Sequence, residues 1–146
     1  MLSVAVWPSS HLIMNKVVTM KTTDSQRHAL YLYLAIASFI LCLFFQTFYR
    51  SFILDNQIGD FGIAGSSVSF WGPLCGMFYF YYRDVSANSF SISIATALGA
   101  SIYECIQPFL RLGYFDWLDI IASCLAGLIF PFFVHLINKT QLIKES

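Results

Sequence analysis

The polar side chains that could do chemistry lie close together in one stretch of the sequence, YECIQPFLRLGYFDWLDIIASCLAGLI. Glu104 and Gln107 are three residues apart, so they share one face of a helix. Asp116, Asp119 and Ser123 have the spacing that places them on one face of the next helix. Carboxylates beside apolar segments are costly unless they are paired, hydrogen-bonded or open to water. We therefore take these residues as the candidate polar site.

Arg111 lies in the turn between the two acidic faces. We expect it to pair with Glu104 and with Asp116 or Asp119, and three interpretations follow. In a structural clamp, Asp116 caps the next helix and Asp119 lies favourably in its first turn. In a binding site, Arg111 holds an anionic group while a carboxylate accepts a proton or binds an ammonium or hydroxyl group. In a metal site, the three carboxylates hold a hard cation, because no histidine accompanies them.

The composition indicates that lipid surrounds these residues. Of the 146 residues, 58% are hydrophobic and 11% are charged, whereas a soluble domain carries about 25% charged residues. The net charge of zero argues against a nucleic-acid partner. We interpret the four cysteines as small buried apolar side chains in separate helices, because their spacing fits no zinc site. They are Cys42, Cys75, Cys105 and Cys124.

Four apolar segments are long enough to cross a bilayer as helices. They are residues 29–49, 63–82, 89–107 and 117–138. A helix needs about 20 apolar residues to cross about 30 Å of hydrocarbon, and membrane strands need an alternating polarity that these segments lack. We therefore predict an all-α fold, a polytopic membrane helix bundle with about four transmembrane helices. The first segment also has no secretory signal before it, and Met14 and Met20 offer later starting points.

Charge places both termini on one side of the membrane. With four crossings, six of the eight Lys and Arg residues fall on the side of the termini, which the positive-inside rule assigns to the cytoplasm. We predict a cytoplasmic N-terminal segment (1–28), a transmembrane domain (29–138) and a cytoplasmic tail (139–146). Small residues four apart are expected where helices pack closely. These pairs are Gly72 and Gly76, Ala95 and Gly99, and Ser123 and Gly127.

The acidic hairpin resembles the conserved hairpin of the VanZ-like family of small bacterial membrane proteins. The residues that fit this pattern are Glu104, Gln107, Phe109, the turn around Arg111 and Gly113, Asp116, Asp119, Ala122 and Gly127. Ser123 stands where the family commonly has Asn, and the resemblance extends more loosely over residues 29–138. Family members usually carry a Lys and a His near the start of the second span, where this chain reads GDFGIAGSSVSFWG.

The resemblance implies a bacterial inner-membrane protein associated with the cell envelope and with glycopeptide-antibiotic resistance, in a family mostly without an established biochemical activity. From the residues, we expect a non-enzymatic protein that binds a lipid headgroup, a cell-wall precursor or a membrane partner at the outward polar site. The alternative is an enzyme for a lipid-linked substrate, with Glu104 or Asp119 as base and Arg111 positioning a phosphate or carboxylate. No P-loop, GxSxG, HExxH or GxGxxG string occurs, and we expect no cofactor and no metal.

Overall fold

The computed structural model describes the backbone of residues 10–110 and 115–145, and the side chains of residues 25–110 and 115–140. All elements in this part of the chain are helices, which confirms the predicted all-α class. In chain order they are α1 (Ser10–Phe44), the π-helical turn η1 (Phe45–Tyr49), α2 (Arg50–Asp55), α3 (Ile63–Arg83), α4 (Ser89–Ile106) and α5 (Trp117–Glu145).

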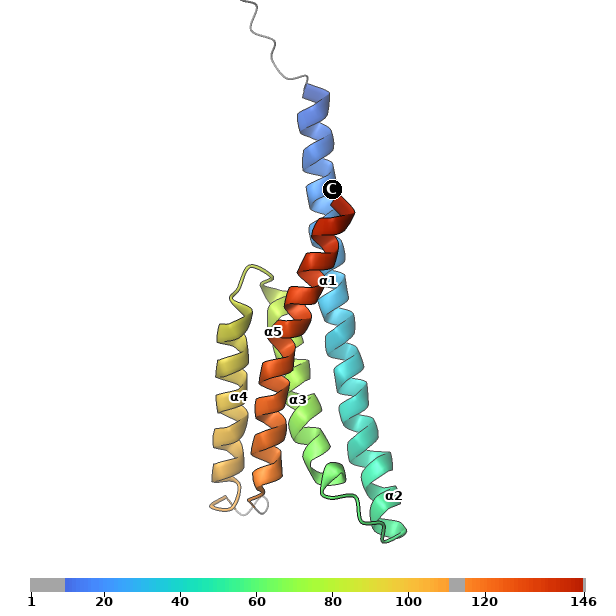
Figure 1. Ribbon diagram of the computed structural model, residues 1–146, viewed down its shortest axis with the longest axis vertical. Coiled ribbons are helices and arrows are strands. Elements are labelled where there is room, and N and C mark those ends of the chain that lie inside the picture. The colour runs from blue at the N-terminus through green and yellow to red at the C-terminus, as the bar shows by residue number, and fades with distance from the viewer. Residues whose placement is uncertain (1–9, 111–114, 146) are drawn as a thin grey trace, which may run out of the picture.

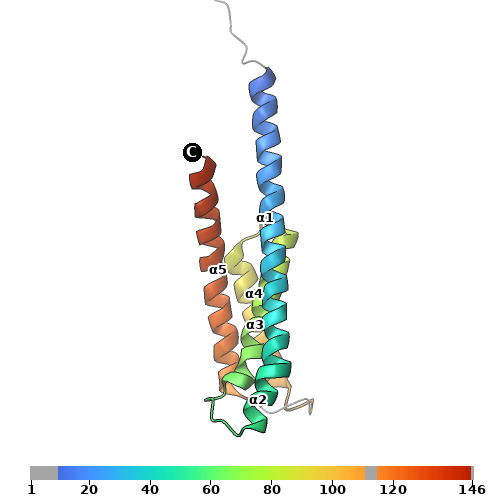
Figure 2. The ribbon, with the colours of Figure 1, turned by 90° about the vertical axis from the view of Figure 1, so that its right-hand side faces the viewer.

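The four long helices form a bundle in which neighbours along the chain run in opposite directions (Figure 1). The start of α1 and the end of α5 therefore lie at the same end of the bundle, which we call the terminal end. The opposite end, which we call the loop end, carries α2 and the segment between α4 and α5. Figure 2 shows that α1 and α5 extend beyond the other helices at the terminal end.

The first helix is longer than the sequence predicted. We expected a span over residues 29–49 followed by a polar connection from Arg50; the helix contains this span and extends beyond it at both ends, so the connection is wrong over Arg50–Asp55. Helix α1 begins at Ser10, and helical structure continues through η1 and α2 to Asp55. The physical reason is that polar residues do not end a helix unless they lower its backbone stability, and no Gly or Pro occurs between Ser10 and Asp55.

The turn before α3 is held by one carboxylate and one glycine. Asp60 accepts hydrogen bonds from the backbone N–H groups of Gly62 and Ala64, at 3.1 and 2.5 Å. Gly62 has a φ of 84°, and a Cβ atom added there would lie 2.5 Å from Cδ1 of Leu118. A side chain at position 62 would therefore be strained by the backbone conformation and would clash with Leu118 at the start of α5.

The turn between α3 and α4 is built from local hydrogen bonds. Asp84 accepts from the backbone N–H of Ser86 at 3.0 Å and from its hydroxyl. These bonds stabilise the ionised carboxylate, so the pKa of Asp84 is lowered from its ordinary value. Asn88 then caps α4, because its Oδ1 accepts from the N–H of Phe90 at 2.9 Å.

The core lies between α1, α3 and α5, and it is largely aromatic. Tyr31 of α1 packs edge-on against Tyr81 of α3, with 4.7 Å between ring centroids. Phe130 of α5 packs edge-on against Tyr81 and tilts steeply against Phe78, at 5.9 and 5.2 Å. Tyr31, Phe130 and Met77 are fully buried. This core joins three of the four long helices.

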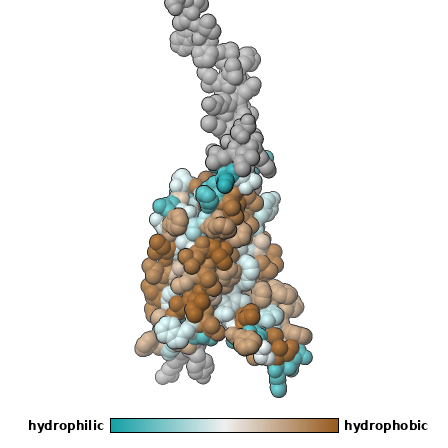
Figure 3. Space-filling view, viewed as in Figure 1, coloured by the Kyte–Doolittle hydropathy of each residue, from teal (hydrophilic) through white to brown (hydrophobic). Residues whose placement is uncertain are grey.

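Three helical stretches in the described residues are long and apolar enough to cross a membrane. They are Ser25–Asp55, Ser89–Ile106 and Trp117–Thr140. Helix α3 is not among them, because serine, glycine, proline and tyrosine residues lower its hydropathy. The surface in Figure 3 carries apolar residues over its middle and hydrophilic residues toward both ends. So many exposed large apolar side chains, from Tyr33 to Leu136, are unusual for a protein surrounded by water.

The small-residue pairs differ in how closely they approach another helix within this chain, and at Gly76 an added Cβ atom would lie 3.9 Å from Cγ2 of Thr96 on α4. A Cβ atom added at Gly127 would lie 3.1 Å from Cβ of Ala97, so α4 and α5 approach closely there. The same atom added at Gly72 or Gly99 would meet nothing within 4 Å. Gly72 lies on the side of α3 opposite the buried Leu74, so it does not reach the core.

Candidate functional site

Ser69 of α3 connects the two acidic faces that the sequence predicted. Its hydroxyl donates to Oε1 of Glu104 on α4, at a long 3.4 Å. Its backbone carbonyl accepts from the hydroxyl of Ser123 on α5, at 2.8 Å. One serine thus links three helices near the loop end. We call Ser69, Glu104, Gln107, Asp119 and Ser123 the polar cluster.

Glu104 is the buried acid of the cluster, with 7% of its surface exposed. The side-chain amide of Gln107 donates to its Oε2 at 2.5 Å, which confirms that these two residues share a helix face. A buried carboxylate must be hydrogen-bonded to offset the loss of water. Glu104 meets this condition with one bond to each oxygen. Both of its oxygens therefore accept a hydrogen bond from a described neighbour, whereas the clamp interpretation depends on Arg111.

Asp116 plays the predicted capping role. Its Oδ1 accepts from the backbone N–H of Leu118 at 2.9 Å, just where α5 begins at Trp117. Its side chain is otherwise exposed. Asp116 is thus an N-terminal cap of α5 rather than a member of the polar cluster.

Asp119 differs from both other acids. Its Oδ1 is buried and has no hydrogen-bond partner among the described residues. The Asp119 carboxylate lies close enough to Glu104 for the two charges to interact, and Arg50 of α2 lies within electrostatic range of it. The Ser69 hydroxyl also interacts with the Asp119 carboxylate. A buried acceptor without a donor is costly, so among the described residues Oδ1 of Asp119 is a carboxylate oxygen that can take a further donor.

Arg111 lies outside the described residues, so its pairing with Glu104, Asp116 or Asp119 stays a prediction. The sequence analysis missed two residues of this region, Ser69 and Arg50. Ser69 belongs to the serine-rich start of α3. Several hydroxyl groups in an otherwise apolar segment could have indicated that this part of α3 faces polar partners on other helices. Arg50 was assigned to the outward side without a role in the site, because its electrostatic range to Asp119 depends on how the end of the first long helix lies beside α5.

The geometry limits the chemistry of the cluster. Among the described residues, no group of three His, Cys, Asp or Glu side chains could hold a metal ion. Glu104 is engaged by its neighbours, so Asp119 is the acid that can accept a hydrogen bond or an ammonium group from a ligand. The chain matches no protein-family model, no curated protein and no solved structure.

Proposed function

We propose that this chain is a multi-pass membrane protein of the VanZ-like kind, in the bacterial inner membrane, with both termini in the cytoplasm. The apolar stretches of α1, α4 and α5 support membrane insertion. The alternating helix directions support an even number of crossings, with the terminal end on one side (Figure 1). The excess of Lys and Arg on the side of the termini supports a cytoplasmic orientation.

In this proposal α3 also crosses the membrane and so brings the number of crossings to four. Its polar residues are shielded by its neighbours, because Ser67 is buried and Ser69 bonds to α4 and α5. A helix inside a membrane bundle can be less apolar than one that faces lipid on all sides, since its hydroxyls find protein partners. Helix α3 contacts each of the other long helices, so it has such partners along its length.

A reporter experiment tests this topology. We expect alkaline phosphatase, which needs an oxidising compartment for its disulfides, to be active when fused after Asn56 or Phe109. We expect it to be inactive after Val85 or Ser146, while green fluorescent protein fluoresces at the same two positions. Phosphatase activity after Val85 would contradict the four-span proposal, because it would place both ends of α3 outside the cytoplasm.

We further propose that the outward polar cluster binds a headgroup that carries an ammonium or hydroxyl group, on a phospholipid or a lipid-linked envelope precursor. The observation that carries this proposal is the buried Oδ1 of Asp119 without a hydrogen-bond partner. Ser69 of α3 joins Glu104 of α4 and Ser123 of α5 beside it. Arg111, on the adjoining turn, would neutralise the phosphate of the same headgroup.

The binding test compares two phospholipids on the purified full-length protein by native mass spectrometry. Phosphatidylethanolamine has an ammonium group that donates hydrogen bonds, whereas phosphatidylcholine has none to donate. We expect Asp119→Asn to weaken phosphatidylethanolamine binding by about tenfold or more, the value of a hydrogen bond to a charged group. Phosphatidylcholine binding should change little.

Asp116→Asn is the matched control, because this exposed side chain already caps α5 and Asn also caps helices. It should leave both lipids unaffected. Arg111→Ala should keep the fold and lose phosphatidylethanolamine binding, whereas a loss of stability would assign Arg111 to the clamp. Equal binding of both lipids to the wild type and to Asp119→Asn would exclude the proposed headgroup site.

A further inference from the structure

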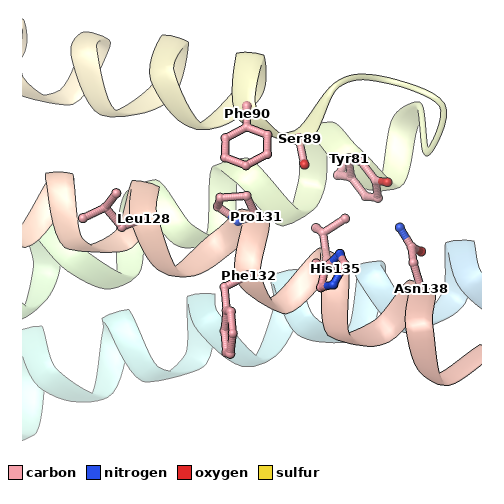
Figure 4. Close-up of a pocket in the computed structure, with 9 residues that line it drawn as sticks. Tyr81, Ser89, Phe90, Leu128, Pro131, Phe132, His135 and Asn138 are labelled. Carbon is pink, nitrogen blue, oxygen red and sulfur yellow. The ribbon is translucent and has the colours of Figure 1, made fainter.

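A second site lies at the terminal end, far along the bundle from the polar cluster. A groove of about 480 Å³ opens between α3, α4 and α5. Its polar side chains are Tyr81, Ser89, His135 and Asn138. Figure 4 shows these groups gathered on one side of the groove, with Phe90, Pro131 and Leu128 toward the other side. We call this groove the headgroup pocket.

An apolar groove continues from the headgroup pocket along α4 and α5. It has a volume of about 490 Å³ and shares Phe90, Leu128 and Pro131 with the pocket. The rest of its lining is mainly small and aliphatic, including Ile94, Ala97, Leu98, Cys124 and Gly127. We call it the acyl groove. Polar groups at one end and an apolar channel at the other match the two parts of an amphiphile.

Ser93 provides an independent sign that something binds here. It lines the acyl groove and is 5% exposed, and its Oγ is buried without a hydrogen-bond partner among the described residues. On α4 it lies four residues beyond Ser89, or about 6 Å deeper along the helix. The hydroxyl therefore lies next to the acyl groove, about one helical turn deeper than the polar pocket.

We infer that the two grooves together hold one glycerophospholipid. The headgroup phosphate lies in the headgroup pocket, where the hydroxyls of Tyr81 and Ser89, the amide of Asn138 and the ring of His135 can donate hydrogen bonds. An ester carbonyl accepts from Oγ of Ser93, and one acyl chain follows the acyl groove. Lys139, on the next turn of α5, adds positive charge at this end. The inference assumes membrane insertion and is otherwise independent of the outward site.

The test measures binding of phosphatidylglycerol to the full-length protein in detergent by native mass spectrometry. Cys124→Trp fills the acyl groove and should weaken binding by about tenfold or more. Cys105→Trp is the matched control, because Cys105 is also exposed but lies outside the groove. Ser93→Ala should weaken binding by about three- to tenfold, and Ser91→Ala, at an exposed position of the same helix, should not.

Each variant is first checked for its melting temperature. If Cys124→Trp does not fold, Leu128→Trp replaces it, because Leu128 is 71% exposed and lines both grooves. Equal losses in Cys124→Trp and Cys105→Trp would overturn the inference, since they would indicate lipid bound without a defined site. Displacement by soluble glycerol phosphate would overturn the lipid assignment. Asp119→Asn should leave this binding unchanged, which separates this site from the outward one.

Discussion

Phe130→Ala is expected to destabilise the bundle by about 2–4 kcal/mol. Phe130 of α5 is fully buried and packs against Phe78 and Tyr81, which both belong to α3. The truncation leaves a cavity at the centre of the aromatic core and removes dispersion contacts on several sides. The expected cost is somewhat below the full range for soluble proteins, because an unfolded membrane helix exposes its side chains to lipid rather than to water.

Unfolding in dodecyl sulfate, followed by tryptophan fluorescence, measures this change. Phe132→Ala is the control, because it removes the same atoms from the same helix at a position that is 60% exposed. We expect it to change the free energy of unfolding by less than about 0.5 kcal/mol. Similar losses in both variants would show that Phe130 does not lie in a core between α3 and α5.

Glu104→Ala is expected to destabilise the bundle by about 2–3 kcal/mol. The change leaves the hydroxyl of Ser69 and the amide of Gln107 without their common acceptor. Both donors are partly buried. A buried donor that loses its partner costs about 1–3 kcal/mol, so we expect the lower part of this range for each, and removal of a buried charge offsets part of the cost. The same unfolding measurement applies.

Two further variants make this result specific. Glu104→Gln keeps the shape and one acceptor oxygen, so it should recover at least half of the lost stability. Cys105→Ala alters the adjacent exposed residue and should have almost no effect. If Glu104→Ala is as stable as the wild type, the polar cluster does not hold the helices together, and the clamp interpretation is wrong.

Features that depend on local sequence were predictable. The spacing of Glu104 and Gln107 predicted that they share a helix face, and the position of Asp116 predicted the cap of α5. The order of apolar segments predicted four long helices. These features follow from the helical repeat, from capping chemistry and from segment length, all of which can be read along the chain.

Features that depend on how the helices are rotated against one another were not predictable. Gly72 has the spacing of a packing residue, but α3 turns the other side toward the core. Ser69 joins α4 and α5 only because its face of α3 points between them. The extension of the first helix through Arg50–Asp55 was missed because polarity was read as a loop. Polarity reports contact with water, whereas the helix ends where backbone preferences change.

The modest hydropathy of α3 has a consequence for how the protein is made. The chain presents α3 to the insertion machinery soon after the strongly apolar stretch Ser25–Asp55, and only Asn56–Gly62 separates the two. A segment that partitions weakly into lipid by itself can enter the membrane as half of a helical hairpin, with its serines already facing a partner helix. We therefore expect α3 to depend on α1 during biosynthesis, so that truncations lacking α1 leave α3 on the cytoplasmic side of the membrane.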